Sequence, residues 1–289
     1  MSENNPHYHT SISRIRERIC FKGAVYHITQ RAPGKERIFL EDRDCLKFLR
    51  ILKEACQEFN FEVYSFALMP NHVHLLFSTN EENLSGAMKN IFECYAKYFN
   101  KKYQRKGHVF CGRFRATLCS DDFYLLSCSI YIHLNPYRAG LCVRPEDYEW
   151  TSVRLYVQVL KTSFVITKRI LSLLAKDEKE AQAMYLKILS QSICLDIGLS
   201  LEKRCVNNAI AQCTRVVREI CGHGDKNEEI KKLIEKFKTA RYVTDLKSQQ
   251  GRRYLIEQLL ANDYSRKEIG EMLGISRSTL ARTVKRVAK

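Results

Sequence analysis

Hydrophobic positions in the first half of the chain either alternate, as in strands, or recur at the spacing of amphipathic helices. The alternation at 24–31 predicts a strand, and the spacing at 42–59 predicts a helix with one apolar face. The remaining elements are predicted as strands at 61–68, 72–78 and 109–118 and as helices at 83–104 and 122–135. This order indicates an α+β, ferredoxin-like fold in which helices cover one face of an antiparallel sheet.

Helical patterns dominate after Tyr148-Glu149-Trp150, so an all-helical part is predicted to follow. Residues 264–282 are typical of a helix-turn-helix, because Gly274 falls at the turn and Ser276 can cap the second helix. The alternative is an ordinary helical hairpin with a cationic surface. The side chains expected to face a DNA major groove are Arg277, Ser278, Thr279 and Arg282. The predicted divisions are 14–155 for the first domain, 156–250 for a helical region of unknown role and 251–289 for the helix-turn-helix module.

His72 and His74 alternate with Val73 in a predicted strand, so both imidazoles point to one face of the sheet. The apolar run at 75–77 continues the strand into a core, which would hold the two rings rigidly. Two imidazoles aimed at one point are the beginning of a metal site, although the same spacing also occurs by chance in structural strands. The pair indicates a metal only if further ligands join it.

Tyr131 and Asn135 are four residues apart in the predicted helix 122–135, so the phenol and the carboxamide share a face. The other tyrosines considered as nucleophiles on predicted helices, Tyr95, Tyr98 and Tyr124, are followed at this spacing by Phe99, Lys102 and Cys128. None of these supplies a neutral oxygen ligand. Pro136 disfavours helical geometry at Asn135, so the helix is predicted to end or kink there.

Together, His72-x-His74, the Gly107–Phe114 segment and Tyr131-x-x-x-Asn135-Pro136 resemble the single-tyrosine HUH transposases, in particular the REP-associated tyrosine transposases of the IS200-like group. The stretch from Tyr26 to Arg31 resembles the opening strand of that family. The resemblance implies a divalent-metal-dependent endonuclease and strand transferase that acts on single-stranded or hairpin DNA. Related insertion-sequence enzymes commonly have Gln where this chain has Asn135, which is the form expected in the REP-associated branch.

In this interpretation His72, His74 and Asn135 hold Mg²⁺ or Mn²⁺ against the scissile phosphate, and Tyr131 is the attacking oxygen. The product is a 5′-phosphotyrosine and a free 3′ hydroxyl. Because the ester conserves the energy of the broken bond, rejoining needs no nucleotide cofactor.

A net charge of +16 and an isoelectric point near 9.3 favour a polyanionic partner. Basic residues between Lys97 and Arg115 occur without an intervening acid and are interleaved with aromatic residues, a composition found in proteins that bind single strands. For the aromatic residues themselves, a place in the core is the favoured interpretation. The expected DNA contacts in this region are Lys102, Arg105, Lys106, Arg113 and Arg115.

The twelve cysteines lack a Cys-x-x-Cys spacing and fall mostly in apolar stretches, so reduced, buried thiols are expected. The sequence has no apolar leader and no run long enough to cross a bilayer, so a cytoplasmic, nucleoid-associated protein without a membrane partner is predicted. Its oligomeric state stays open. Two other functions compete with the nuclease: a non-catalytic DNA-binding regulator that uses the helix-turn-helix, and an RNA-binding module, which is ranked last.

Overall fold

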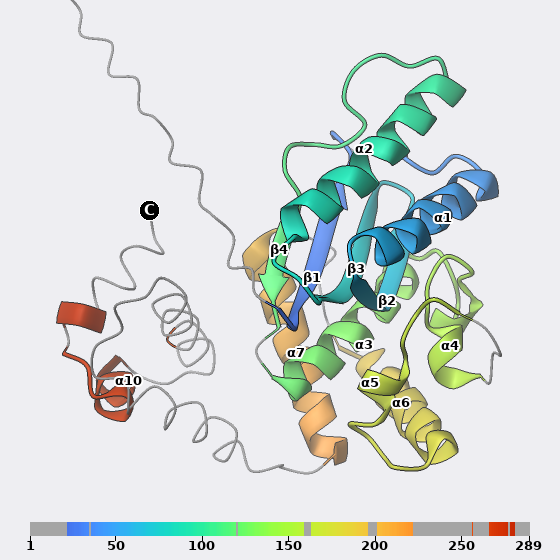
Figure 1. Cartoon of the computed structure of the whole chain (residues 1–289). Coiled ribbons are helices and arrows are strands. Elements are labelled where there is room, and N and C mark those ends of the chain that lie inside the picture. Colours follow the sequence, from blue (N-terminus) through green and yellow to red (C-terminus); the bar gives the residue numbers. More distant parts are fainter. Residues whose placement is uncertain are drawn as a thin grey trace, which may run out of the picture.

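A computed structural model describes residues 22–34, 36–119, 121–158, 163–195, 201–221, 256, 266–276 and 278–280. Its first part alternates strands and helices, and its second part is helical (Figure 1). The elements of the first part are β1 (Ala24–Arg31), α1 (Asp42–Glu58), β2 (Phe61–Met69), β3 (His72–Thr79), α2 (Leu84–Lys102), β4 (Arg115–Leu118) and α3 (Asp122–Arg138). Those that follow are η1 (Pro145–Asp147), α4 (Arg154–Val157), α5 (Lys168–Leu171), α6 (Glu178–Ser192), α7 (Lys203–Cys221) and α10 (Arg266–Leu273).

The four strands form one antiparallel sheet in the order β2-β3-β1-β4. This order, with one helix between β1 and β2 and another between β3 and β4, is the ferredoxin-like arrangement. The fold class is therefore confirmed. The strand that carries His72 and His74 is internal, paired on one side with β1 and on the other with β2.

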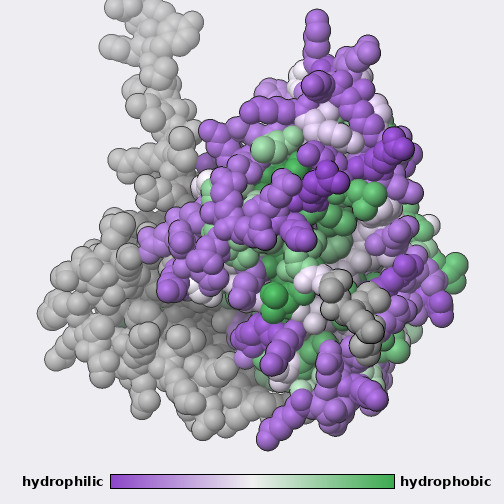
Figure 2. All heavy atoms as spheres, turned by 45° about the vertical axis from the view of Figure 1, so that its right-hand side comes forward, coloured by the Kyte–Doolittle hydropathy of each residue, from purple (hydrophilic) through white to green (hydrophobic). Residues whose placement is uncertain are grey.

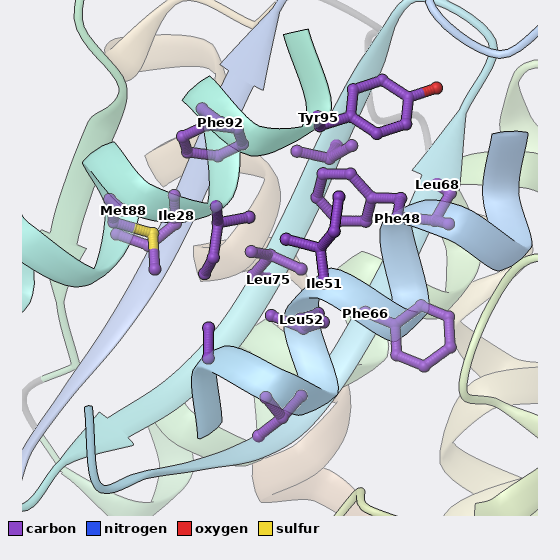
Figure 3. Packing of buried hydrophobic residues seen from close by; sticks show 14 of the residues in the cluster. Ile28, Phe48, Ile51, Leu52, Phe66, Leu68, Leu75, Met88, Phe92 and Tyr95 are labelled. Carbon is purple, nitrogen blue, oxygen red and sulfur yellow. The ribbon is translucent and has the colours of Figure 1, made fainter. Parts of the chain in front are cut away.

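One face of the sheet, here called the apolar face, is covered by α1 and α2. Alternate residues of β1 and β3, among them Ile28 and Leu75, point into this core and meet Phe48 of α1 and Tyr95 of α2 (Figure 3). These four side chains are all buried, and most of their neighbours are aliphatic or aromatic. Burial of this apolar surface is the main term that holds the sheet in register.

The opposite face, here called the histidine face, is covered by α3, and α6 and α7 pack behind that helix (Figure 1). Residues 125–136 of α3 are buried on every side, as expected for a helix enclosed between a sheet and further helices. The region beyond residue 155 thus shares a core with α3. The divisions at 155 and 250 stay predictions.

Two element boundaries differ from the sequence expectation. Only Arg115–Leu118 of the predicted strand 109–118 pairs with β1. Gly107 and Gly112 have φ of +96° and +63°, and such left-handed residues form a loop in place of a strand. In addition, α3 continues past Pro136 to Arg138, because the amides of Ala139 and Leu141 still reach the carbonyls of Asn135 and Pro136 at 2.9 and 3.0 Å. The proline ring removes only one helical donor, in a turn that is already buried.

Near the C-terminus, α10 ends in a tight turn at Gly274, whose φ of +61° is a left-handed conformation that glycine adopts without strain. The Ser276 hydroxyl accepts the Thr279 amide at 3.2 Å and so caps the next helical turn. Ile269, Leu273 and Leu280 are buried. This is the local geometry predicted for the helix-turn-helix.

Hydrophilic side chains cover most of the face turned forward in Figure 2, with hydrophobic side chains exposed between them. Within the described residues, no helix has the length and hydropathy needed to cross a bilayer. The eleven described cysteines are free thiols, but only Cys45, Cys128 and Cys213 are buried, so the expectation of buried thiols holds for these three alone. The others lie on helix or loop positions that face outward or partly outward.

Candidate active site

Strand β3 places His72 and His74 side by side on the histidine face, with ring centroids 5.0 Å apart. The pairing with β1 sets Arg31 opposite His72 and Thr29 opposite His74, so these four side chains share the face. Val73 points the other way into the apolar core. The alternation expected from the sequence therefore describes the strand correctly.

Each imidazole has one nitrogen engaged and one without a partner. His72 Nδ1 donates to the Asn71 Oδ1 at 2.7 Å, since an amide oxygen can only accept. His74 Nδ1 lies 3.0 Å from His27 Nε2, and their rings are stacked. The Nε2 atoms of both His72 and His74 are buried and have no hydrogen-bond partner among the described residues. Buried polar atoms are rarely left unpaired, so these two nitrogens mark a place where a ligand belongs.

Burial keeps the imidazoles neutral. It lowers the pKa of His72 to about 4, and it lowers that of His74 well below the ordinary value, with like-charge repulsion from His72 and His27 adding to the effect. A neutral imidazole with a free Nε2 lone pair is the form that coordinates a metal ion. The protonation state of the pair therefore suits a cation.

Tyr131 reaches the same place from α3. This helix begins where the Asp121 carboxylate accepts the Tyr124 amide at 2.8 Å. The Tyr131 ring meets His74 edge-on at a centroid distance of 5.6 Å. Burial raises the pKa of its phenol, while a hydrogen bond with the Asn135 side chain acts in the opposite direction. The two histidines and the tyrosine, predicted from separate motifs, are thus brought together.

Asn135 lies one helical turn from Tyr131, as predicted, and its Nδ2 donates to the Tyr131 carbonyl at 2.7 Å. The amide is fixed by this bond, and its Oδ1 is the atom left to act as a ligand. In the described part of the chain, no group of three or more His, Cys, Asp and Glu side chains has the arrangement of a metal site. The carboxamide oxygen of Asn135 stays the third ligand predicted from the sequence.

Two of the other tyrosines weighed from the sequence, Tyr95 and Tyr98, lie on the opposite side of the sheet. Tyr95 is buried in the apolar core, where its hydroxyl donates to the Ile38 carbonyl at 2.5 Å. The Tyr98 hydroxyl donates to the Asp44 carboxylate at 3.0 Å, also on that side of the sheet. Neither phenol can reach the histidine pair, because the sheet lies between them.

His27 is a member of the site that the sequence analysis did not single out. It is fully enclosed, touches His74 through the 3.0 Å nitrogen contact and meets the Tyr131 ring at a centroid distance of 5.8 Å. When His74 presents its Nε2 lone pair, its Nδ1–H donates to His27, so His27 fixes the tautomer and the ring orientation. The signal in the sequence was the alternation in β1, but only the strand register shows which histidine it meets.

His133 shows what a satisfied buried histidine looks like in the same helix. Its Nδ1 lies 2.7 Å from the Tyr185 hydroxyl of α6 and its Nε2 lies 2.8 Å from the Ser152 hydroxyl. The Tyr185 hydroxyl also lies 2.7 Å from Ser129 Oγ. This network joins α3 to α6 and leaves His133 no free nitrogen for a ligand.

The DNA contacts predicted in the first domain divide into two groups. Lys102 forms ion pairs with Asp44 at 2.6 Å and Glu41 at 2.5 Å, and Arg105 forms one with Glu36 at 2.5 Å. Acids far upstream in the sequence thus neutralise these two side chains. The remaining first-domain contacts, Lys106, Arg113 and Arg115, are exposed. In the C-terminal module Ser278 is exposed and Thr279 is half-buried, whereas Arg277 and Arg282 lie outside the described residues.

Comparison with known proteins identifies the family of the first domain. Residues 20–135 match the family described as IS200-like transposases. This part of the chain is an IS200-like transposase domain. Residues 248–289 match the homeodomain-like domains, which confirms the helix-turn-helix module.

A curated relative from Haemophilus influenzae, named as a REP-associated tyrosine transposase, is 26% identical over 144 residues, which are 45% of this chain and 80% of the relative. A solved structure of a REP-associated tyrosine transposase bound to a REP hairpin is 19% identical and covers 49% of this chain and 84% of its own, with a TM-score of 0.43. The family resemblance seen in the sequence is confirmed for residues 20–135, and this domain is an enzyme domain of the DNA transposase class.

Proposed function

We propose that this transposase cleaves and rejoins single-stranded or hairpin DNA through a covalent 5′-phosphotyrosine at Tyr131, with a divalent cation, Mg²⁺ or Mn²⁺, held by His72, His74 and Asn135. The observation that carries this proposal is the pair of buried, unpartnered Nε2 atoms beside the Tyr131 ring. A structural cluster would pair these nitrogens, as the chain does for His133. Two open nitrogens next to a phenol support a site built for a metal and a phosphate.

The donor set fits the proposed ion. Two neutral imidazoles and one amide oxygen leave further positions for water and phosphate oxygens, and Mn²⁺ accepts nitrogen ligands more readily than Mg²⁺ does. When bound, the cation neutralises charge on the scissile phosphate and favours its in-line displacement. Asn71 and His27 keep the two imidazoles in the orientation that leaves their Nε2 lone pairs free.

The chain's own chemistry centres on Tyr131. Because burial raises the pKa of this phenol, it is protonated at neutral pH and must lose its proton as it attacks. A bond forms between Tyr131 Oη and phosphorus, and the bond from phosphorus to the 3′ oxygen breaks. The released 3′ oxygen takes up a proton and becomes a free hydroxyl, while the 5′ phosphate stays on the protein. Attack by a 3′ hydroxyl on this ester reverses the step and frees the tyrosine.

The substrate assignment rests on the family and on the charge of the chain. The relative from Haemophilus influenzae is named for its association with REP elements, and the net charge of +16 favours a nucleic acid. We assign the C-terminal helix-turn-helix to duplex DNA next to the cleaved strand, through Ser278, Thr279, Arg277 and Arg282. This module also supports the second candidate, a regulator that binds DNA without cleaving it.

The experiment that separates the two candidates is a search for the covalent adduct. The full-length protein is incubated with labelled single-stranded and hairpin oligonucleotides in Mn²⁺ or Mg²⁺ and analysed under denaturing conditions. The proposal predicts a protein–DNA band that is lost on chelation and absent in Tyr131→Phe. This variant deletes one oxygen and should bind DNA within a few-fold of the wild type. Tyr137→Phe, on the same helix, is the matched control and should keep the band.

An adduct that survives Tyr131→Phe and maps to another tyrosine would show that the nucleophile is wrong. Specific DNA binding without any adduct, under all metal conditions, would favour the regulator.

A further inference from the structure

The open hollow at the end of β1 is lined by arginines from two parts of the chain. Its walls include Arg31 at the end of β1, Arg113 in the loop before β4 and Arg115 in β4. The Cys111 amide donates to the Arg31 carbonyl at 2.8 Å, and Gln30 Nε2 donates to the Gly112 carbonyl at 3.1 Å. These bonds fasten the loop to the strand, so the hollow is shaped before any ligand arrives.

The strand register connects this hollow to the candidate active site. Thr29 is the partner of His74 on one side and of Arg115 on the other, so the three form one row across the histidine face. Arg31 is the partner of His72 in the next row. Since neighbouring strands lie about 4.8 Å apart, the backbones of His74 and Arg115 are separated by about 10 Å. The arginines therefore extend the face of the sheet that carries the imidazoles.

Among the described residues, no acidic side chain neutralises the charge in the hollow. No acidic side chain lines it, and Arg31 and Arg113 are exposed and form no ion pair with an acid in the described residues. Arg115 donates to the Leu201 carbonyl, which positions its guanidinium without cancelling its charge. This differs from Lys102, whose ammonium group is held by two carboxylates.

We infer that this arginine hollow binds one backbone phosphate of the DNA strand that is cleaved at Tyr131, close to the cleavage point. The inference rests on the proposed function and adds to it a second anchoring point for the strand. Guanidinium groups bind phosphate oxygens in pairs of parallel hydrogen bonds, which suits three arginines around one anion. Because phosphates wind around the helix axis as well as rise along it, a separation of about 10 Å places the bound phosphate one or two nucleotides from the cleavage point.

The test replaces the phosphates of a cleavable oligonucleotide, one at a time, with uncharged methylphosphonates and measures binding to the full-length Tyr131→Phe protein. We expect one replacement, one or two nucleotides from the cleavage point, to weaken binding about tenfold or more. Arg31→Ala and Arg113→Ala should weaken binding of the unmodified strand to a similar degree and become insensitive to that replacement. Each should also reduce the slope of affinity against salt by about one ion.

Arg50→Ala is the matched control, because Arg50 is an exposed arginine of α1 on the other side of the sheet. It should keep wild-type affinity and the full methylphosphonate effect. If Arg31→Ala and Arg113→Ala lose as much affinity as Arg50→Ala on methylphosphonate replacement at every position, the phosphate site is refuted. This holds even if the wild-type protein forms the adduct. Binding with the expected pattern by a protein that never forms an adduct would instead refute the proposed function and leave the phosphate site standing.

Discussion

The two faces of the sheet bury polar groups in opposite ways. On the side of α1 and α2 the buried carboxylate of Asp44 receives donors from Lys102, Tyr98 and Tyr103 at 2.6, 3.0 and 2.8 Å, as well as the amides of Leu40 and Glu41. On the other side, the Nε2 atoms of the site histidines have no partner. Both arrangements are costly to bury, but only the first is compensated inside the protein. A buried donor or acceptor without a hydrogen-bond partner therefore points to function, whereas one that is hydrogen-bonded within the protein points to structure.

The largest effect is expected where the open nitrogens are removed. His72→Ala or His74→Ala should abolish adduct formation, because each deletes one proposed ligand. Saturating Mn²⁺ should raise the melting temperature of the wild type, since a ligand at 100 times its Kd adds about 2.7 kcal/mol of stability. Neither variant should show that rise. Adduct formation at the wild-type rate in either one would contradict the metal assignment.

The two substitutions should differ in stability. His72 is only partly buried, so His72→Ala should leave the melting temperature without metal nearly unchanged. His74 is fully buried and hydrogen-bonded to His27, so His74→Ala should lower it. Two ligands of equal exposure would instead give equal changes.

The cluster around Asp44, whose buried carboxylate is fully hydrogen-bonded, should affect stability and leave metal binding unchanged. Asp44→Asn should cost about 3 kcal/mol of unfolding free energy, because it leaves the Lys102 charge without its buried partner. Metal affinity and the adduct should be unchanged below the melting temperature. Although burial alone raises the pKa of Asp44, the hydrogen bond from Lys102 and the other donors hold it below 3.8.

The sign of the pH effect on Asp44 follows from that shift. The unfolded chain binds the proton more tightly, so the stabilisation by the carboxylate is present above pH 3.8 and is lost as the pH falls through the lower folded pKa. The stability difference between the wild type and Asp44→Asn should therefore narrow in strong acid. Denaturant unfolding at pH 7 and pH 3 measures it, and a gap that widens in acid would be inconsistent with the shift.

Local patterns predicted the parts of the site that depend on one element. Strand alternation placed His72 and His74 together, and helical spacing placed Asn135 one turn from Tyr131, because both periods are fixed by backbone geometry. Contacts between elements were beyond such reasoning. His27 meets His74 across a separation of 47 residues, and Lys102 meets Asp44 across 58. The segment around Lys102 contains no acid, yet its charge is paired, because the folded chain brings α1 beside α2.

Substitutions of His27 test whether metal binding at His72 and His74 depends on the residue that orients His74. His27→Leu removes the acceptor for His74 Nδ1 and should weaken Mn²⁺ binding about tenfold to a hundredfold, as is usual for outer-shell partners of metal ligands. His27→Gln can supply an amide oxygen in place of Nε2 and should restore part of the affinity. Calorimetric titration gives both values. Asp44→Asn is the control for general destabilisation, and an equal loss of Mn²⁺ affinity there would remove the special role of His27.

The smallest effect is expected in the network that gives both ring nitrogens of His133 a hydrogen-bond partner. Tyr185→Phe removes the hydroxyl that lies 2.7 Å from both His133 Nδ1 and Ser129 Oγ. Ser129 keeps its 2.7 Å contact with Ser65 Oγ, so only one buried nitrogen loses its partner, at a cost of about 1–2 kcal/mol. Metal affinity should stay at the wild-type value, because the network touches neither ligand histidine. Denaturant unfolding and Mn²⁺ titration of the same preparation check both statements. A loss of metal affinity with little loss of stability would mean that α6 helps to set the position of α3 at the active site. The hydrogen-bonded His133 and the proposed ligands His72 and His74 would then be energetically coupled.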